Sequence, residues 1–360
     1  MKAKIIIAGG GTGGHIYPGV AIARAIQRLS PDIDIHFVGA HGGLEENIIP
    51  REKFALHLVS VGRLHKSVSL VTRLTTLLKM PIALIQCLIV LIKLRPISVL
   101  GVGGFASGPM LLVASLLNYR TYIWEPNAMP GMANRWLAGF VTETLLVFEE
   151  ARKFLKAKKI RLVGIPVRFS LAARKSQDAK LRLLIFGGSQ GARAINEIVF
   201  QFIESNADKY KDLLEIVHQT GPLDFARAQK IYSAAPAHFQ CFEYLHDMKD
   251  RFAWCDLVIA RSGASTVAEI IACRKAAVFI PLPTAADDHQ RKNAEVLVKK
   301  NAAEMILQSD FNLERLTNTI ESFIQNRDKI AKFSESVQSF EFAKSDEEIA
   351  KILLGDLVKK

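Results

Sequence analysis

The sequence has few cysteines, few aromatic residues and no paired-cysteine motif. Its 360 residues include four cysteines, none of them in a Cys-x-x-Cys pair: Cys87, Cys241, Cys255 and Cys273. This excludes a disulfide framework and a paired zinc motif, and it predicts free thiols in a reducing compartment. Aromatic residues make up only 8% of the chain, while Ile, Leu, Val and Ala are abundant. That balance is typical of buried parallel sheets covered by helices.

The length and the apolar content indicate a globular chain of more than one domain. Hydrophobic residues make up 49% of the sequence, which excludes disorder, and the 23 Gly and 13 Pro show no collagen-like period. At roughly 150 residues per domain, two domains are expected. The apolar run at 5–8 is too short for a signal peptide and is followed directly by glycines. We therefore interpret it as a first strand.

Negative charge is scarce in the first half of the chain. Residues 1–165 hold 20 Lys and Arg against 9 Asp and Glu, whereas the remainder holds 27 against 26. No carboxylate lies between Glu52 and Glu125. A basic surface favours phosphate groups, whether of nucleic acid, nucleotide or anionic lipid. Nucleic acid is not expected as a partner, because the chain shows no aromatic interleaving, no helix-turn-helix pattern and no zinc finger.

The basic window contains an apolar stretch at 68–94, for which two interpretations are open. One is an ordinary crossover helix at 82–94 that packs on a sheet and begins near Pro81. The other is a membrane-surface patch ringed by cations, formed by Leu70, Leu74, Leu77, Leu78 and Met80. The uncharged stretch at 80–92 has 13 residues, fewer than the ~20 that a membrane-spanning helix needs. Contact with an anionic membrane through the basic apolar region 63–95 is therefore expected to be peripheral.

Short β-branched runs alternate with helical patterns along the whole chain. The expected strands are 4–8, 33–38, 97–102, 121–124, 144–147, 160–163, 181–186, 214–218, 256–260, 276–280 and 303–307. The expected helices include 18–29, 190–204, 264–273 and 289–300. This alternation predicts an α/β fold of doubly wound parallel sheets. The strand, glycine turn and helix start of residues 2–15 recur at 181–194, which predicts two Rossmann-like halves.

A glycine- and proline-containing connection at 163–168, followed by a polar stretch, marks the expected domain boundary. The predicted domains are an N-terminal one at 1–164 and a C-terminal one at 165–335. The charged tail at 336–360 has helical periodicity and can pack back on the N-terminal domain.

Three glycine-rich turns follow predicted strands. The first, at 9–15, contains G-x-G-x-x-G, but the next strand ends without the Asp or Glu that would hold a ribose, which disfavours a nicotinamide cofactor. The second, at 103–109, and the third, at 187–192, also place backbone N–H groups at the carboxyl ends of strands. Together they predict a cleft between two halves that handles phosphates.

Four motifs carry a resemblance to a known family. The segments GGGTGGHIYPG, GVGGFASGP, GGSQGA and RSGASTVAE, in this order and spacing, resemble the MurG family of bacterial peptidoglycan glycosyltransferases over roughly residues 4–345. The resemblance implies a GT-B fold, with two Rossmann-like domains facing across a cleft. It also implies an inverting transfer of N-acetylglucosamine from UDP-N-acetylglucosamine to the C4 hydroxyl of the muramoyl sugar of lipid I, an undecaprenyl-diphosphate-linked acceptor, which gives lipid II. Such an enzyme acts peripherally at the cytoplasmic face of the bacterial plasma membrane.

The resemblance further implies which residues bind the two substrates. The acceptor diphosphate would be bound in the N-terminal domain by Gly11, Gly13, Gly14, Gly103, Gly104 and Asn134. UDP-N-acetylglucosamine would be bound by Thr12, Gly13, Gly14, Asn127, Arg168, Ser189, Leu245, Ser265, Thr266, Glu269, His289 and Gln290. Within the donor set, Ser189 and Thr266 are expected at helix N-termini, where they suit diphosphate oxygens. Glu269 is expected to accept hydrogen bonds from the ribose hydroxyls.

The transfer needs a base, because the attacking hydroxyl must lose its proton. His15, at the end of the first glycine turn, is the expected catalytic base since imidazole titrates near neutral pH. Glu125 is its rival. Helix dipoles together with Ser189, Thr266 and Arg168 are expected to balance the charge of UDP, so neither a metal nor another cofactor is expected.

Three other functions stay open on the sequence alone. The first two are enzymes, a related GT-B glycolipid glycosyltransferase and a UDP-N-acetylglucosamine 2-epimerase. An epimerase has no lipid acceptor and so no need of the cationic apolar region. The third is a non-catalytic protein that binds a UDP-sugar or a polyprenyl phosphate, and the presence of both His15 and Glu269 disfavours it.

Overall fold

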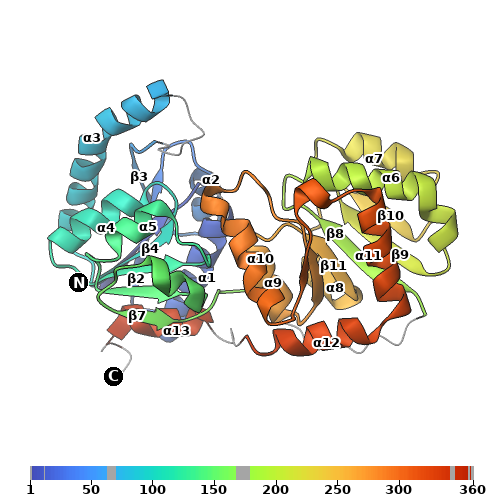
Figure 1. Ribbon diagram of the computed structural model, residues 1–360. Coiled ribbons are helices and arrows are strands. Elements are labelled where there is room, and N and C mark those ends of the chain that lie inside the picture. Colours follow the sequence, from blue (N-terminus) through green and yellow to red (C-terminus); the bar gives the residue numbers. More distant parts are fainter. Residues whose placement is uncertain are drawn as a thin grey trace. The chain divides into compact units, whose positions relative to one another are not determined.

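The computed structural model describes residues 2–11, 13–62, 70–167, 179–340, 345–355 and 357, with side chains of the helix at 70–94 described from Met80 onward. The chain forms two compact units (Figure 1). Unit 1 comprises residues 1–168 and 342–360, and unit 2 comprises residues 169–341. Each unit is a parallel sheet with helices packed on it.

Unit 1 contains a seven-stranded parallel sheet of order β3-β2-β1-β4-β5-β6-β7. Its strands are β1 (Lys4–Gly9), β2 (Asp34–Ala40), β3 (Ala55–Val59), β4 (Ser98–Gly103), β5 (Thr121–Glu125), β6 (Glu143–Leu146) and β7 (Ile160–Leu162). Its helices are α1 (Gly13–Leu29), α2 (Glu45–Arg51), α3 (Leu70–Leu94), α4 (Ser107–Leu116), α5 (Met132–Leu137), the 3-10 helix η1 (Glu149–Phe154) and α13 (Ser345–Leu354).

Side chains of β1 alternate between the two faces of this sheet, and both faces are buried. Ile6 and Ala8 join a core that contains Cys87 and Leu91 of α3 and Met110 of α4. The opposite face carries Ile5 and Ile7, which are equally buried. Burial on both faces explains why the central strands are continuous apolar runs rather than alternating ones.

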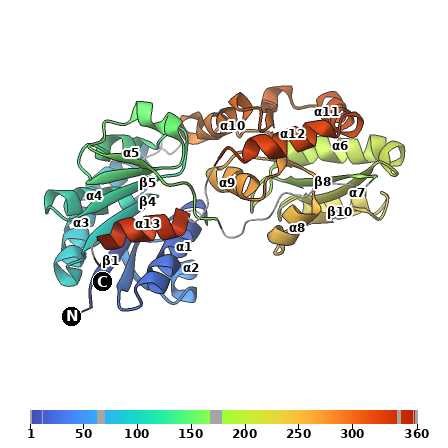
Figure 2. The ribbon, with the colours of Figure 1, turned by 90° about the horizontal axis from the view of Figure 1, so that it is seen from below.

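The last helix of the chain belongs to unit 1. Helix α13 lies along α1, as Figure 2 shows, and Arg28 of α1 forms an ion pair with Asp346 of α13 at 2.8 Å. The hydroxyl of Tyr122 in β5 donates to the carbonyl of Ile352 at 3.5 Å. The chain therefore returns to unit 1 after completing unit 2.

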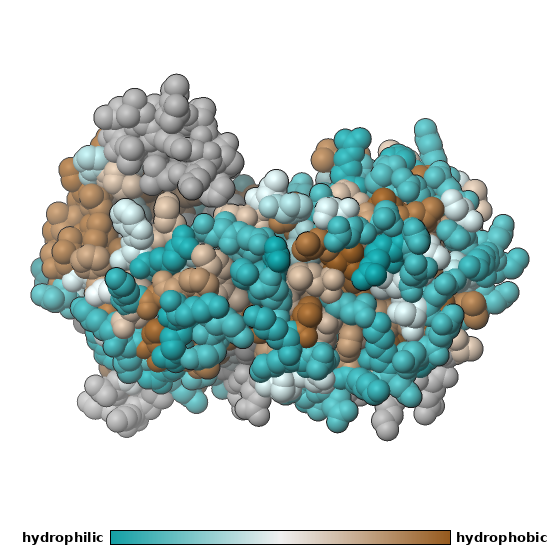
Figure 3. All heavy atoms as spheres, in the orientation of Figure 1, coloured by the Kyte–Doolittle hydropathy of each residue, from teal (hydrophilic) through white to brown (hydrophobic). Residues whose placement is uncertain are grey.

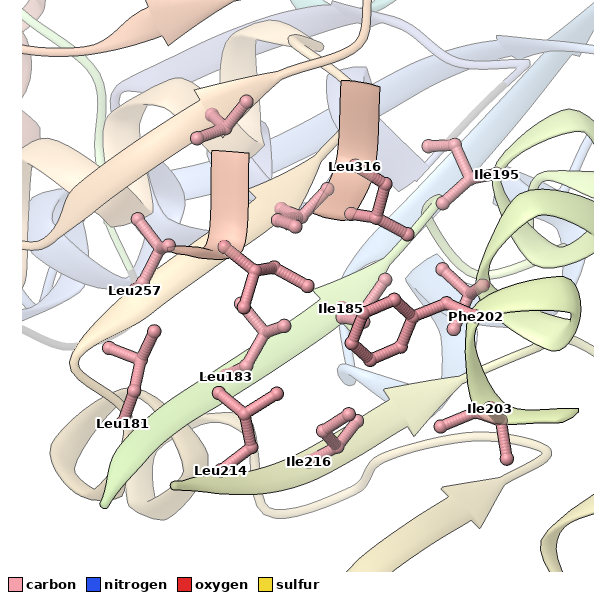
Figure 4. Packing of buried hydrophobic residues seen from close by; sticks show 14 of the residues in the cluster. Leu181, Leu183, Ile185, Ile195, Phe202, Ile203, Leu214, Ile216, Leu257 and Leu316 are labelled. Atoms are coloured by element: carbon pink, nitrogen blue, oxygen red, sulfur yellow. The ribbon is translucent and has the colours of Figure 1, made fainter. Parts of the chain in front are cut away.

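Unit 2 contains a six-stranded parallel sheet of order β10-β9-β8-β11-β12-β13. Its strands are β8 (Leu181–Phe186), β9 (Leu214–Gln219), β10 (Phe239–Phe242), β11 (Leu257–Ala260), β12 (Ala276–Phe279) and β13 (Glu304–Met305). Its helices are α6 (Arg193–Tyr210), α7 (Phe225–Tyr232), α8 (Met248–Trp254), α9 (Ala264–Ala272), α10 (His289–Lys299), α11 (Leu313–Gln325) and α12 (Asp328–Val337), with 3-10 helices η2 (Ala286–Asp288) and η3 (Gln308–Asp310). Figure 4 shows Leu183 and Ile216 of the sheet packing toward Phe202 of α6.

All eleven strands expected from the sequence are present, and two further strands were missed. The missed strands, β3 and β10, lie at the edges of their sheets and are only partly buried. An edge strand needs no continuous apolar run, so the sequence signal is weaker there. The helix that was expected to begin near Pro81 instead runs unbroken from Leu70 to Leu94, with Pro81 inside it. Pro81 cannot donate a backbone hydrogen bond. The burial of Ala83, Cys87 and Leu91 in the following turns offsets this loss.

The strand order places the motif loops of each unit side by side. In unit 1 the first strand, β1, pairs with β2 on one side and with β4 on the other. In unit 2, β8 pairs in the same way with β9 and β11. The carboxyl ends of β1 and β4, and of β8 and β11, are therefore the points where the strand order reverses. Open α/β sheets bind ligands at these points.

One buried histidine makes the stability of unit 2 sensitive to acid. His218 of β9 is fully buried, with Nδ1 3.0 Å from the hydroxyl of Tyr232 and Nε2 3.1 Å from Oδ1 of Asn196. Burial lowers the pKa of His218 from 6.5 to about 3. The unfolded chain therefore binds a proton that the folded chain does not take up between these pH values. The stability that the neutral ring contributes is complete above pH 6.5 and is lost as the pH falls toward 3.

We predict that His218 lowers the free energy of unfolding of unit 2 by up to about 1.4 kcal/mol for each pH unit below 6.5. In the variant His218→Gln this part of the pH dependence should be absent. The slope is measured by pulsed hydrogen exchange of β8 and β9 peptides across a urea series at several pH values. The exposed His246→Gln is the matched control and should keep the wild-type slope. Equal slopes in His218→Gln and the wild type would contradict the prediction.

Candidate active site

The first two glycine loops of unit 1 contact each other at the carboxyl ends of β1 and β4. The N–H of Gly10 donates to the carbonyl of Gly103 at 3.2 Å. A Cβ atom on Gly104 would overlap the backbone of Gly10, and one on Gly9 would overlap the carbonyl of Gly103. Gly103 and Gly104 also have positive φ angles of 97° and 84°, a conformation that favours glycine. These glycines let two backbone segments meet directly at the switch point of the sheet.

His15 lies in the first turn of α1, beside the second loop. Its Nδ1 is 3.0 Å from the carbonyl oxygen of Val102, which can only accept, so Nδ1 carries the proton and the neutral ring has its lone pair on Nε2. A Cβ atom on Gly103 would overlap the His15 ring. The two loops therefore hold the imidazole in the tautomer that can take up a proton at Nε2.

Glu125 and the two expected asparagine residues form one hydrogen-bonded cluster, in which Glu125 and Asn134 are buried. Oε1 of Glu125 accepts from the N–H and the Nδ2 of Asn127 at 3.0 and 3.1 Å. Oε2 accepts from the N–H of Gly131 at 3.0 Å and from Nδ2 of Asn134 at 2.8 Å. Burial raises the pKa of Glu125, and these four donors act in the opposite direction. The carboxylate thus holds the loop after β5 and orients both asparagine side chains.

The third glycine loop follows β8 in unit 2. The N–H of Gly191 donates to the carbonyl of Gly188 at 2.9 Å, and these residues have φ angles of 75° and 97°. A Cβ atom on Gly191 would overlap the carbonyl of Thr220 at the end of β9. Ser189 is exposed in this turn. It precedes the first residue of α6, Arg193, by four positions, so the expectation of Ser189 at the helix N-terminus itself is wrong.

Gln219 connects this glycine loop to the segment that contains Leu245. Its Nε2 donates to the carbonyl of Gly188 at 2.9 Å, and its Oε1 accepts from the N–H of Leu245 at 2.9 Å. Gln219 and Leu245 are both buried. Gln219 was not among the expected site residues. The one sequence signal for its role in holding these two segments is its position directly at the end of a buried strand.

The segment after β11 leads into helix α9 and contains three more residues that are expected to bind UDP-N-acetylglucosamine. Ser265 is exposed and Thr266 half-buried in the first turn of the helix. Glu269 follows one turn later and is buried. Serine and threonine hydroxyls beside the unpaired N–H groups of a helix start suit an anionic group.

A hydrogen-bond network ties this segment to the start of α10. The hydroxyl of Ser262 donates to the carbonyl of Gln290 at 2.8 Å, and the N–H of Leu282 donates to Oε1 of Gln290 at 3.0 Å. Nδ2 of Asn293 donates to the carbonyl of Ser262 at 3.2 Å. Nδ1 of His289 lies 2.8 Å from the carbonyl of Ala286. The side-chain oxygen of Gln290 is thus engaged within the chain.

Arg261 is a buried cation at the same edge of the sheet. Its guanidinium donates to the carbonyls of Ile280 and Pro281 at 2.9 and 3.0 Å, and to Oε1 of Gln308 at 2.6 Å. Burial lowers the pKa of Arg261 to about 10, so it stays charged at neutral pH. It joins the end of β11 to the end of β12 and to the 3-10 helix η3.

Some expected site residues cannot be placed. Thr12 and Arg168 lie outside the described residues, as do residues 63–69 and the side chains of Leu70, Leu74, Leu77 and Leu78. Across the part of the chain that is described, no three His, Cys, Asp or Glu side chains come together as a metal-binding group.

The visible part of α3 has two apolar faces. Ala83, Cys87, Leu91 and Leu94 are buried against the unit, as the crossover-helix interpretation predicts. The opposite face exposes a row of isoleucines, each 51–58% accessible: Ile82, Ile85, Ile89 and Ile92. Figure 3 shows this face as a hydrophobic area over α3. None of the described helices is both long and apolar enough to span a membrane.

Comparisons with known proteins identify the family. Models of the glycosyltransferase family 28 N-terminal and C-terminal domains match residues 5–146 and 182–350. A UDP-N-acetylglucosamine–N-acetylmuramyl-(pentapeptide) pyrophosphoryl-undecaprenol N-acetylglucosamine transferase of Bdellovibrio bacteriovorus is 46% identical over 98% of this chain and 99% of its own. The transferase of the same description from Myxococcus xanthus is 36% identical over 99% and 94% of the two chains.

A solved structure shares the fold. The crystal structure of Acinetobacter baumannii MurG superposes with a TM-score of 0.82 at 26% identity, covering 98% of this chain and 99% of that one. The two parallel sheets thus form the expected GT-B fold. The chain belongs to glycosyltransferase family 28 and is an N-acetylglucosamine transferase of the MurG group.

Proposed function

We propose that this chain transfers N-acetylglucosamine from UDP-N-acetylglucosamine to the C4 hydroxyl of the muramoyl sugar of lipid I, which yields lipid II. The observation that carries this proposal is the 46% identity, over nearly the whole chain, to a transferase whose name gives the same sugar donor and an undecaprenol-linked muramyl acceptor. The loop pairs at the switch points of both sheets support it. Each pair leads into helix starts, whose backbone N–H groups suit a diphosphate, and this reaction has one diphosphate on the donor and another on the acceptor.

We assign the donor to the C-terminal half, residues 165–335. Ser189, Ser265 and Thr266 suit the diphosphate, and Arg168 is expected beside them. Glu269 suits the ribose, and the amide of Gln290 suits a sugar hydroxyl next to His289. The peptide of Leu245, held by Gln219, suits the uracil.

We assign the acceptor to the N-terminal half, residues 1–164, and the proton transfer to His15. The C4 oxygen of the acceptor attacks the anomeric carbon from the side opposite to UDP. Its proton passes to Nε2 of His15 while the bond from the anomeric carbon to the phosphate oxygen breaks. UDP leaves with the electron pair, and the configuration is inverted. Glu125 is less suited as base, since both of its oxygens already accept hydrogen bonds.

We predict that His15→Ala lowers kcat by about 10²-fold or more, because a positioned base typically contributes this much. The affinity for UDP, measured by calorimetry, should stay near that of the wild type. His41→Ala, an exposed histidine of the same unit, serves as control. Turnover is followed with radiolabelled donor, with and without lipid I. Wild-type turnover in His15→Ala would remove His15 as the base, and sugar products without lipid I would favour an epimerase.

We predict that Gln219→Leu raises the donor KM by about tenfold, because two hydrogen bonds that hold the donor loops are lost. The KM for lipid I should change less than twofold. Gln240→Leu on the neighbouring edge strand is the matched control, since Gln240 is exposed. The prediction is checked by steady-state kinetics with each substrate varied in turn. An unchanged donor KM in a folded Gln219→Leu would count against the assignment of these loops to the donor.

We also propose that the protein binds peripherally to the cytoplasmic face of the bacterial plasma membrane through the region 63–95. The isoleucine row of α3 supports this, since an exposed apolar face at a basic segment suits an anionic bilayer. Lys93 and Arg95 are exposed at the end of the helix, beside this row. The lipid tail of the acceptor requires an enzyme that works at such a surface.

We predict that the double variant Ile85→Glu with Ile89→Glu binds phosphatidylglycerol vesicles at least about tenfold more weakly, because two large apolar side chains no longer enter the interface. Transfer to a water-soluble acceptor analogue should be unchanged. Leu223→Glu, at a residue of unit 2 that is 89% exposed, is the control. Vesicle sedimentation measures the binding. Equal binding of the double variant and the control would refute a role for this face.

A further inference from the structure

Glu45, the first residue of α2, has a carboxylate buried against the first glycine loop. The residue is only 1% exposed. Its Oε2 accepts from the N–H of Gly11 at 2.7 Å, and its Oε1 accepts from the N–H of Ala40 at 3.0 Å. The carboxylate therefore connects the turn after β1 to the end of β2.

Three glycines make room for this carboxylate. A Cβ atom on Gly10 or on Gly43 would overlap the carboxylate itself, and one on Gly39 would overlap the side chain of Glu45. These glycines come from the first glycine loop, from β2 and from the turn before α2. Three separate backbone segments thus close around one side chain, which makes the position specific for a group of this length and shape.

The same loop holds the parts of the acceptor site. Gly10, which lies against the carboxylate, donates to Gly103 of the second loop. His15 follows Gly11 by four residues and is hydrogen-bonded to Val102, beside Gly103. The loop that Glu45 contacts is thus the one that leads into the helix of His15.

The carboxylate also limits how this loop can bind an anion. The N–H of Gly11 points to Glu45, so it is not the donor that a diphosphate would use. A negative charge at this position repels a phosphate placed beside it. The N–H groups of Gly13 and Gly14, in the first turn of α1, remain suitable for the acceptor.

We propose that Glu45 is a positioning residue for the transfer reaction. It holds the first glycine loop in the conformation that presents His15 and the amides of Gly13 and Gly14 to the acceptor, and it keeps the Gly11 amide from the diphosphate. This inference rests on the proposed function, because it assigns the acceptor to unit 1.

The test is Glu45→Gln, which keeps the shape but places an NH₂ group against a backbone N–H that needs an acceptor. We expect kcat to fall and the KM for lipid I to rise, each by at least about tenfold, as expected for the loss of a hydrogen bond to a charged group. The affinity for UDP-N-acetylglucosamine should stay within twofold of the wild type. In ¹⁵N NMR spectra, the Gly11 amide and the His15 ring nitrogens should shift.

Glu46→Gln is the matched control. Glu46 lies on the same helix and also accepts from a backbone amide, that of Gly42 at 3.0 Å, but it does not contact the glycine loop through that bond. It should leave kinetics and the His15 spectrum unchanged. Glu45→Asp keeps the charge but is one methylene shorter, and it replaces Glu45→Gln if that variant does not fold.

The outcomes are distinct. Kinetics of Glu45→Gln equal to those of Glu46→Gln would overturn the proposal, as would failure of both Glu45 variants to fold, which assigns the residue to stability. A wild-type protein that forms no lipid II would instead refute the proposed function. In that case the shift of the His15 nitrogens still decides whether Glu45 positions the loop.

Discussion

Direct contact between backbone segments at the ends of β1 and β4 is the constraint on which the site in unit 1 depends. Gly10 and Gly103 are hydrogen-bonded to each other, and a side chain on Gly104 would overlap Gly10. These glycines let two loops touch where the strand order reverses. His15 packs against Gly103, and Glu45 packs against Gly10. The tautomer of His15 follows from its hydrogen bond to the Val102 carbonyl next to this contact.

Unit 2 reaches an equivalent arrangement with polar side chains in addition to glycines. Gln219 joins the glycine loop after β8 to the segment of Leu245. Arg261 and Ser262 join the loop after β11 to the segments that follow β12. Neutral amides and one buried guanidinium hold these loops, whereas a carboxylate holds the first loop of unit 1.

Much of the fold could be predicted because the central strands are buried on both faces and are followed by glycines. β1 and β8 are clear examples, whereas the edge strands β3 and β10 lack a continuous apolar run. The motif residues of the site could be located in the same way. Glu45 and Gln219 were harder to locate, because the Gly11 amide lies 34 residues from Glu45 and the backbone partners of Gln219 lie 26 and 31 residues away. The row at Ile85 and Ile89 was hidden because both faces of α3 are apolar.

An amide NMR titration of the protein with UDP-N-acetylglucosamine tests the proposed donor site most directly. The central claim is that the two loops at the switch point of unit 2 hold the nucleotide. It predicts that the shifts at residues 188–191, 245 and 264–266 are larger than any in the loops of unit 1. Large shifts confined to residues 9–15 and 103–105 would contradict it.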